Sequence, residues 1–220
     1  MPTATAASSS PFLPPEHGGR VDEPPGDAKR ALRREARATR AAAHAATGEA
    51  AARAVCRSVL EGGLVPAGAT VGGYWPIGGE LDCRPLLRAL HDLGCWCALP
   101  VVTGAGQPLR FRLWQPGDAL APGAAGTLEP AEDAPEILPE VLLVPLLGFD
   151  AAGHRLGQGG GHYDRTLAAM RASGDPVRAV GLAFAVQEVP ELPATGLDQR
   201  VDWVVTERRV WRFQGERRSP

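Results

Sequence analysis

Short apolar runs alternate with helical patterns along most of this 220-residue chain. Such an alternation favours an α/β fold, in which helices connect the strands of a largely parallel sheet. We therefore expect a layered fold with a mostly parallel central sheet flanked by helices. The expected strands are residues 70–75, 95–102, 109–114, 141–146, 177–184 and 203–206, and the expected helices among them are residues 84–93 and 164–172.

Two stretches depart from this alternation. Residues 109–114 alternate strictly between apolar and polar side chains, which is typical of a half-exposed strand at the edge of a sheet. Residues 116–139 are rich in Gly, Pro and Glu, so we expect a long irregular connection there.

The N-terminal residues 1–26 are rich in Pro, Gly and Ser and lack the basic and apolar regions of a secretory signal. Their few apolar groups predict a disordered tail. Asp27 is a good helix N-cap, and residues 28–46 are strong helix formers; a second helical pattern covers residues 49–60, after Gly48. A domain averages roughly 150 residues, so we expect a single domain over residues 27–220.

Charge and cysteine content exclude several classes of protein. The formal net charge of −2 argues against binding to nucleic acid or membranes by bulk electrostatics, and no apolar run approaches the roughly 20 residues that cross a bilayer. Cys95 and Cys97 form a C-x-C pair near His91, but no second Cys or His pair follows at zinc spacing. We favour buried reduced thiols over a zinc site, and hence a cytoplasmic protein.

The chemistry is expected in the segment after the apolar run 141–150. Residues 157–161 hold four glycines in five positions, directly before an expected helix. Glycines let backbone N–H groups approach an anion, and a helix N-terminus adds positive potential, so the segment predicts a polyphosphate site. Arg155 is expected to hold phosphate oxygens and Asp164 to bind Mg²⁺. The alternative is a structural turn in which Asp164 merely caps the helix.

The glycine segment matches neither of two common nucleotide motifs. A Walker A loop ends in Gly-Lys-Ser/Thr, and His162 occupies the last glycine position of G-x-G-x-x-G. A dinucleotide-dependent oxidoreductase would also need an acidic residue at the end of the next strand, where Phe184 stands. The arginine-rich helix leaves open a non-catalytic nucleic-acid-binding protein, against which the net charge argues. A related fold that has lost its activity is a further alternative.

The sequence of residues 155–165, Arg-Leu-Gly-Gln-Gly-Gly-Gly-His-Tyr-Asp-Arg, preceded by residues 144–150, closely resembles the signature of the 5-formyltetrahydrofolate cyclo-ligase family. This family is also called methenyltetrahydrofolate synthetase. Weaker matches follow in family order, so that the resemblance covers roughly residues 27–207. They are residues 29–33, 73–80, 181–184, Gln187, 198–202 and 205–207.

The resemblance implies an enzyme that uses ATP to convert 5-formyltetrahydrofolate to 5,10-methenyltetrahydrofolate, releasing ADP and phosphate. In the family's reaction the formyl oxygen is phosphorylated and N10 then attacks the activated carbon. The resemblance also implies small-molecule substrates and Mg²⁺, without nucleic acid or a membrane as partner. We expect a monomer in the cytoplasm.

The resemblance assigns a role to each matching residue. Arg155 and Tyr163 are expected to be catalytic. ATP is expected to contact Lys29, Arg33, Arg155, Leu156, Gly157, Gln158, Gly159, Gly160, Gly161, His162 and Tyr163. The folate is expected to contact Trp75, Glu80, Gln158, Gly159, Gly160, Gly161 and His162. Asp164 and Asp198 are expected to hold the metal ion.

Taken without the resemblance, several of these residues have plainer interpretations. Lys29 and Arg33 would belong to a solvated basic face, because the same helix also carries Arg30, Arg34, Arg37 and Arg40. Glu80 would be a surface glutamate, Trp75 a core side chain and Asp198 a turn residue. We assign the remaining tryptophans, Trp96, Trp114, Trp203 and Trp211, to packing.

Overall fold

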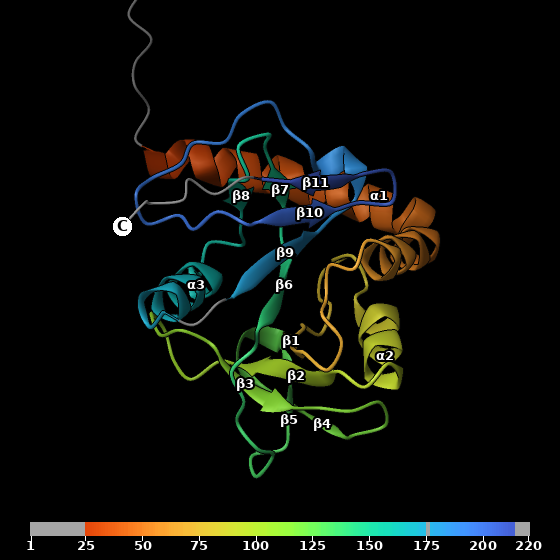
Figure 1. The fold of residues 1–220 in the computed structure, drawn as a ribbon. Helices are drawn as coiled ribbons and strands as arrows, with labels where there is room; N and C mark the ends of the chain where they lie inside the picture. Colours follow the sequence, from red (N-terminus) through yellow and green to blue (C-terminus); the bar gives the residue numbers. More distant parts are fainter. Residues whose placement is uncertain (1–24, 175–176, 214–220) are drawn as a thin grey trace, which may run out of the picture.

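A seven-stranded sheet forms the centre of the molecule (Figure 1). The computed structural model describes residues 25–174 and 177–213, so residues 1–24 of the expected tail lie outside the described part. The inner strand pairings are parallel and the two outermost pairings are antiparallel, which confirms the expected α/β fold. In order across the sheet the strands are β11 (Val210–Arg212), β10 (Trp203–Val205), β9 (Arg178–Leu182), β6 (Val141–Pro145), β1 (Thr70–Gly72), β2 (Trp96–Val101) and β3 (Arg110–Leu113).

The central strand β6 is covered on both faces. Val141 and Leu143 belong to the hydrophobic core on one side of the sheet, and Leu142 and Val144 belong to the core on the other. Successive side chains of a strand point to opposite faces, so a continuous apolar run fits a strand buried on both sides. The strictly alternating strand β3 lies at the sheet edge, as expected.

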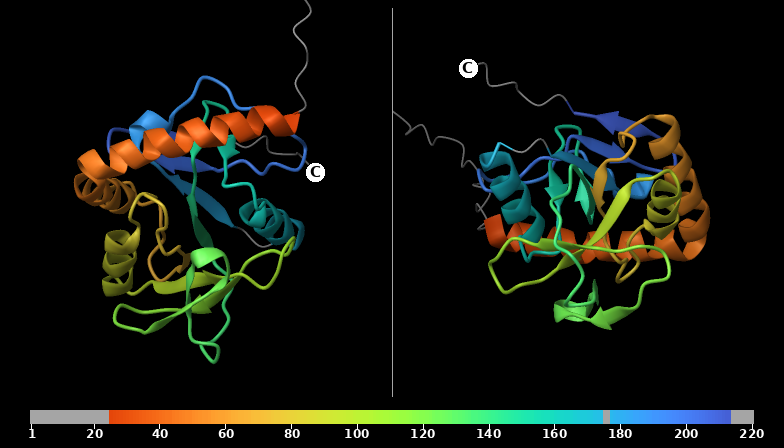
Figure 2. Two further views of the ribbon diagram at one scale, coloured as in Figure 1. Left: turned by 180° about the vertical axis from the view of Figure 1, so that it is seen from behind. Right: turned by 60° about the horizontal axis from the view of Figure 1, so that its bottom comes forward.

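Helices cover both faces of the sheet, which gives three layers (Figure 2). Val55 of α1 (Pro25–Glu61) and Leu87 of α2 (Arg84–Asp92) pack in one core. Leu167 of α3 (His162–Ala172) packs in the other core. The two cores thus lie on opposite faces of the same strands.

Helix α1 corrects two expectations. It begins at Pro25, so Asp27 lies inside the first turn and is not the N-cap; proline fits the first turn of a helix because its missing N–H has no intrahelical partner. The helix also runs through Gly48 without the expected interruption. A Cβ at Gly48 would lie 3.2 Å from His44 Nδ1, so the glycine leaves room for the imidazole. Its helix penalty of about 1 kcal/mol is small beside the packing of a long helix.

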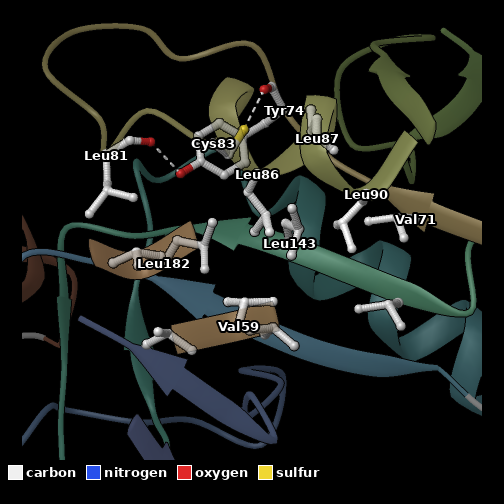
Figure 3. Close-up of a cluster of buried hydrophobic side chains, with 14 of the residues drawn as sticks. Val59, Val71, Tyr74, Leu81, Cys83, Leu86, Leu87, Leu90, Leu143 and Leu182 are labelled. Atoms are coloured by element: carbon white, nitrogen blue, oxygen red, sulfur yellow. Dashed lines mark hydrogen bonds between the residues drawn. The ribbon is translucent and has the colours of Figure 1, made fainter. Parts of the chain in front are cut away.

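Two hydrogen bonds fix the segment that follows β1 (Figure 3). The Tyr74 hydroxyl donates to the Leu81 carbonyl at 2.6 Å, and the Cys83 thiol donates to the Tyr74 carbonyl at 2.9 Å. All three side chains are buried in the core beside α2. These bonds tie Tyr74 to Leu81 and Cys83, so the loop of residues 75–80 between them is held in one conformation.

Two small hairpins were not expected from the sequence. The stretch 116–139 is not wholly irregular, because it contains the antiparallel pair β4 (Leu120–Pro122) and β5 (Leu128–Pro130) around the short 3₁₀ helix η1 (Ala124–Gly126). The apolar run after β6 also turns back as the pair β7 (Gly148–Phe149) and β8 (Arg155–Leu156). A second 3₁₀ helix, η2 (Ala185–Gln187), follows β9.

The cysteines and most tryptophans pack as expected. Cys95 and Cys97 are buried, and Trp114 is buried against Trp75. Trp96 was assigned wrongly to packing, because its side chain is 60% exposed at the start of β2. Trp96 and its pairing partner Thr70 are the first residues of their strands, and the Trp96 side chain lies on the sheet face opposite Cys97, beyond the apolar residues of the second core. Within the described residues, no helix has both the length and the apolarity to cross a membrane.

Candidate active site

A cavity of about 680 Å³ opens where several parallel strands end. Pro145 ends β6, Tyr74 follows β1, and Val102 follows β2, and all three line this cavity. Ligands of open α/β sheets bind beyond the carboxyl ends of the strands, so the cavity lies where the fold favours a site. Ten of the expected site residues line it, namely Trp75, Glu80, Arg155, Gly157, Gln158, Gly160, Gly161, His162, Tyr163 and Asp164.

One face of α1 holds the loops around the cavity. Lys29 Nζ donates to Asp198 Oδ2 at 2.7 Å, and Arg33 Nε donates to the Gly157 carbonyl at 3.0 Å. Because helical residues four apart lie on the same face, these cations reach neighbouring loops. They are therefore partners of the site loops and not merely a solvated basic face.

The same helix face contributes two residues that the sequence analysis set aside. Arg37 Nε donates to Gln158 Oε1 at 3.1 Å, and Arg40 Nη2 donates to the Gly78 carbonyl at 2.9 Å. Both arginines line the cavity. Their spacing of eight and eleven residues from Lys29 places them on its face of the helix, and this periodicity was the signal that could have identified them.

The glycine loop takes conformations that other residues rarely adopt. Gly159 has φ +109°, and Gly161 has φ +66° immediately before α3. Residues with a Cβ are strained in this left-handed region, so the backbone conformation itself favours glycine at both positions. Gly161 is the N-cap, which places Asp164 inside the first turn and excludes its interpretation as a simple cap. The loop follows β8, not the parallel strand β6 directly.

Arg155 and Asp164 form an ion pair in the cavity wall. Arg155 Nη2 donates to Asp164 Oδ1 at 2.9 Å, and the backbone N–H of Gln199 donates to the same oxygen at 2.9 Å. Arg155 is buried, and its Nε finds no hydrogen-bond acceptor among the described residues. Such a donor favours an anionic oxygen as partner.

Tyr163 supplies a protonated phenol beside this pair. Burial raises the pKa of Tyr163 well above its ordinary value, and the nearby Glu80 carboxylate adds to the rise. The hydroxyl therefore remains a hydrogen-bond donor at neutral pH.

Glu80 is buried in a tight turn, which contradicts its interpretation as a surface glutamate. The backbone N–H of Ile77 donates to Glu80 Oε2 at 3.1 Å, and Arg40 Nη1 lies 3.6 Å from Glu80 Oε1. Gly78 and Gly79 both have positive φ within this turn. Burial raises the pKa of Glu80, and the Ile77 N–H, Arg40 and Gln158 lower it in part.

Trp75 forms part of a largely apolar wall. Its ring meets that of Trp114 edge-on, with centroids 6.0 Å apart, and the Arg84 guanidinium lies 5.2 Å from its centroid. The wall continues through apolar residues from four other parts of the chain, namely Pro100, Val102, Leu109, Leu128 and Pro145. A flat heterocycle fits between such a wall and a few polar groups.

Asp198 closes a turn and also contacts α1. Its Oδ2 accepts from the backbone N–H and hydroxyl of Thr195 at 2.6 and 2.8 Å, besides Lys29. Burial alone would raise the pKa of Asp198, but these hydrogen bonds outweigh it and the pKa is lowered. Asp198 is therefore a turn residue and also a partner of the α1 side chain Lys29. Gln199, the next residue, connects this turn to Asp164.

Asp164 and Asp198 are the carboxylates expected to bind a metal ion. Among the described residues, no group of three or more His, Cys, Asp or Glu side chains gathers as a metal site. Each of Asp164 and Asp198 uses one carboxylate oxygen for the hydrogen bonds above, and the second oxygen accepts none from the described residues. Mg²⁺ commonly takes one or two carboxylates together with phosphate oxygens and waters, so the oxygen left over on either carboxylate suits a metal ion that arrives with a polyphosphate.

Five expected site residues lie outside the cavity lining, namely Lys29, Arg33, Leu156, Gly159 and Asp198. The Leu156 side chain packs against Leu147 and Leu192 in a separate small core, which leaves its backbone as the only part suited to a ligand. A Cβ at Gly159 would lie 3.5 Å from the Arg33 guanidinium, an ordinary contact distance, so this glycine lies against α1 and it is its φ of +109° that favours glycine.

The comparisons with known proteins agree on one family. The model of the 5-formyltetrahydrofolate cyclo-ligase family matches residues 25–207. A relative of that name from Escherichia coli K12 is 37% identical over 150 residues, which cover 66% of this chain and 81% of the relative. One from Mycolicibacterium smegmatis is 36% identical over 142 residues, which cover 60% of this chain and 71% of the relative.

Solved structures agree with the sequence matches. The structure of Aquifex aeolicus 5,10-methenyltetrahydrofolate synthetase superposes with a TM-score of 0.71 and 28% identity, and the match covers 87% of this chain and 96% of that one. A synthetase of the same name from Mycoplasma pneumoniae has a TM-score of 0.64 at 19% identity and supports the fold. The chain therefore belongs to the 5-formyltetrahydrofolate cyclo-ligase family of enzymes.

Proposed function

We propose that this enzyme uses ATP and Mg²⁺ to convert 5-formyltetrahydrofolate to 5,10-methenyltetrahydrofolate, with release of ADP and phosphate. One observation carries the proposal: a single cavity is lined both by the buried Glu80 carboxylate and by the Arg155–Asp164 loop with its glycines. A carboxylate matches the adjacent N–H donors of a pterin ring, and a glycine-rich loop with an arginine matches a polyphosphate. The lining of one cavity thus supports a site for both substrates of the proposed reaction.

The proposed chemistry begins at the formyl oxygen, which is a poor leaving group. Transfer of the γ-phosphoryl group of ATP to that oxygen forms a P–O bond, breaks the bond to ADP and activates the formyl carbon. N10 then forms a bond to this carbon, loses its proton, and the C–O bond breaks as phosphate leaves. The protein needs to position the reactants and stabilise charge, because no covalent bond to the protein is required.

Cations of the site are the proposed means of charge stabilisation. Arg155 is buried beside the glycine loop, and its Nε has no acceptor within residues 25–174 and 177–213, so its guanidinium suits the phosphoryl oxygens. Lys29 and Arg33 lie on the α1 face that touches the same loop and the Asp198 turn. The protonated Tyr163 hydroxyl supplies a further donor to the transferred group or the formyl oxygen.

Asp164 and Asp198 are the proposed holders of Mg²⁺, each through the oxygen that the described residues leave without a hydrogen bond. When bound with ATP, the ion neutralises charge on the phosphate oxygens. Arg155 and the Gln199 N–H orient the Asp164 carboxylate through its other oxygen. This orientation is the contribution of the chain itself.

Exclusion of water is the remaining requirement, because an activated formyl group would otherwise hydrolyse. The apolar wall around Trp75 covers one side of the cavity, and β5 contributes Leu128 to it. Phosphoryl transfer and attack by N10 would thus proceed in a space with little free water.

A direct assay tests the proposal. Purified protein mixed with 5-formyltetrahydrofolate and Mg-ATP should form 5,10-methenyltetrahydrofolate, which absorbs in the near ultraviolet, with one ADP released per product. Omission of ATP or addition of a chelator should stop the reaction. Product formation without ATP, or no product at high enzyme concentration, would contradict the proposal. A cytoplasmic location and a monomeric state remain predictions for fractionation and light scattering.

A further inference from the structure

We propose that Arg40 is a positioning residue for the reaction: it holds the Glu80 carboxylate ionised and directed at the bound folate. The inference rests on the proposed function, in which Glu80 binds the folate ring. It concerns a residue that needs no contact with either substrate for this role.

The Arg40 guanidinium is fixed by three groups from two loops. Its Nη2 donates to the Gly78 carbonyl at 2.9 Å, and its Nη1 donates to the Leu146 carbonyl at 3.5 Å and lies 3.6 Å from Glu80 Oε1. The residue projects from the rigid helix α1 and is 2% exposed. The turn that carries Glu80 is therefore attached to the same helix that contacts the glycine loop.

Packing alone does not explain an arginine at this position. Its Nε is buried without a hydrogen-bond partner among the described residues, and burying an unmatched donor is unfavourable. A buried ion pair seldom adds more stability than apolar side chains of similar volume. An arginine in these surroundings is better explained by its effect on the Glu80 carboxylate.

Glu80 needs a compensating cation because its surroundings oppose its charge. Burial raises its pKa, while Arg40 lowers the pKa in part, together with the Ile77 N–H and Gln158. Tyr74, Cys83 and Tyr163 also face Glu80 electrostatically, but burial raises the pKa of each of them. They are neutral near pH 7, so the positive charge that faces Glu80 comes from Arg40.

Loss of the Arg40 charge should weaken binding of the folate and leave binding of the nucleotide unchanged. A carboxylate accepts two N–H donors, whereas the protonated acid offers a competing O–H donor. Without Arg40 the pKa of Glu80 rises further, so kcat/KM for the folate should fall at neutral pH and recover as pH rises. The ATP contacts proposed for Arg155 and the glycine loop do not involve Arg40.

The test compares Arg40→Met, Arg40→Lys, Glu80→Gln and the double variant Arg40→Met/Glu80→Gln. We expect Arg40→Met to raise KM for 5-formyltetrahydrofolate about tenfold or more and to leave KM for ATP within about twofold. The acid limb of kcat/KM for the folate should shift to higher pH. Arg40→Lys should restore part of the affinity, and Arg40→Met should cause little further loss in the Glu80→Gln background.

The measurements show whether or not Arg40 positions Glu80. Equal increases in both KM values, an unshifted pH profile, or losses that add in the double variant would overturn the positioning role. If Arg40→Met does not fold, as judged by thermal unfolding, the KM values of Arg40→Lys decide the question: a rise confined to KM for the folate supports the role, and equal rises in both KM values overturn it. Failure of the proposed function is distinguishable, because the wild-type protein would then form no methenyltetrahydrofolate and Glu80→Gln would change nothing.

Discussion

Lys29 Nζ lies 2.7 Å from Asp198 Oδ2, although the two residues are 169 positions apart in the sequence. The contact joins the start of α1 to the turn before β10, and it pairs a proposed phosphate-binding cation with a proposed metal-binding carboxylate. Without ligand, each charge compensates the other. Mg-ATP would offer phosphate oxygens to Lys29 and a metal ion to Asp198. The ion pair is therefore suited to open when the nucleotide binds, because each side chain gains a new partner.

Lys29→Met should weaken nucleotide binding far more than it weakens the fold. We expect KM for ATP to rise roughly tenfold, which corresponds to the loss of one charged contact, whereas a partly exposed ion pair contributes only about 0–1 kcal/mol to stability. Steady-state kinetics and thermal unfolding measure the two effects. Arg34→Met removes an exposed charge from the same helix as a matched control and should change neither quantity. A large loss of stability with unchanged KM would show that the contact is structural.

Asp164→Asn should impair the use of Mg²⁺. The amide can still meet Arg155 and the Gln199 N–H through its oxygen, but it offers the metal ion no negative charge. We expect kcat to fall about 100-fold or more and the Mg²⁺ concentration for half-maximal activity to rise. Titration of activity with Mg²⁺ at saturating ATP measures both. Asp92→Asn, at the exposed end of α2, is the control and should leave the titration unchanged.

The layered fold could be predicted because its central strands are buried on both faces. An apolar run such as residues 141–145 has few alternatives to a covered strand. The two small hairpins and the continuous α1 could not be predicted in the same way. At Gly48 the intrinsic helix penalty is overridden by neighbouring helical residues, and at β4 and β5 short Gly- and Pro-rich strands carry little pattern.

The part of the candidate site that lies on one continuous segment could be predicted from the sequence. The part that forms only where distant segments come together could not. The loop from Arg155 to Asp164 is local, so its composition alone indicated a phosphate site. Arg37 and Arg40 were missed because their partners, Gln158 and Gly78, are brought to α1 only by the fold. Burial of Glu80 likewise depends on the turn that Arg40 attaches to α1.

Asp150 is expected to stabilise the hairpin that precedes the glycine loop. Its buried carboxylate accepts the backbone N–H groups of Ala152, His154 and Leu192 and lies 3.0 Å from His154 Nδ1. Asp150→Asn retains the shape but replaces one accepting oxygen with a donor, so we expect a loss of about 1–3 kcal/mol in the free energy of unfolding. Denaturant unfolding near neutral pH measures it. Asp118→Asn, at an exposed turn, should lose less than about 0.5 kcal/mol.

The stabilisation of the fold by Asp150 should decrease as the pH falls. Burial would raise the pKa of Asp150, but its hydrogen bonds with His154 and the backbone outweigh burial and lower the pKa below the ordinary 3.8. A group whose pKa is lower in the folded state stabilises the fold above its unfolded pKa, and this contribution is lost as pH falls through the folded value. The difference between wild type and Asp150→Asn should therefore shrink below about pH 4. A difference that grew on acidification would contradict the assignment.

The four thiols should differ in reactivity although all are free. Burial raises the pKa of Cys97 to about 12 and raises that of Cys83 strongly, and both thiols donate to backbone carbonyls. The thiolate is the reactive form, so neither should alkylate in the folded protein near neutral pH. Cys56 is half-buried on α1, and its pKa is also raised by burial, but it is the thiol that reagents reach most easily. Intact-mass analysis after brief treatment with iodoacetamide should show one adduct at Cys56, none in Cys56→Ser, and four in the unfolded wild type. Early labelling of Cys97 would instead indicate that the edge of the sheet at β2 and β3 opens in solution.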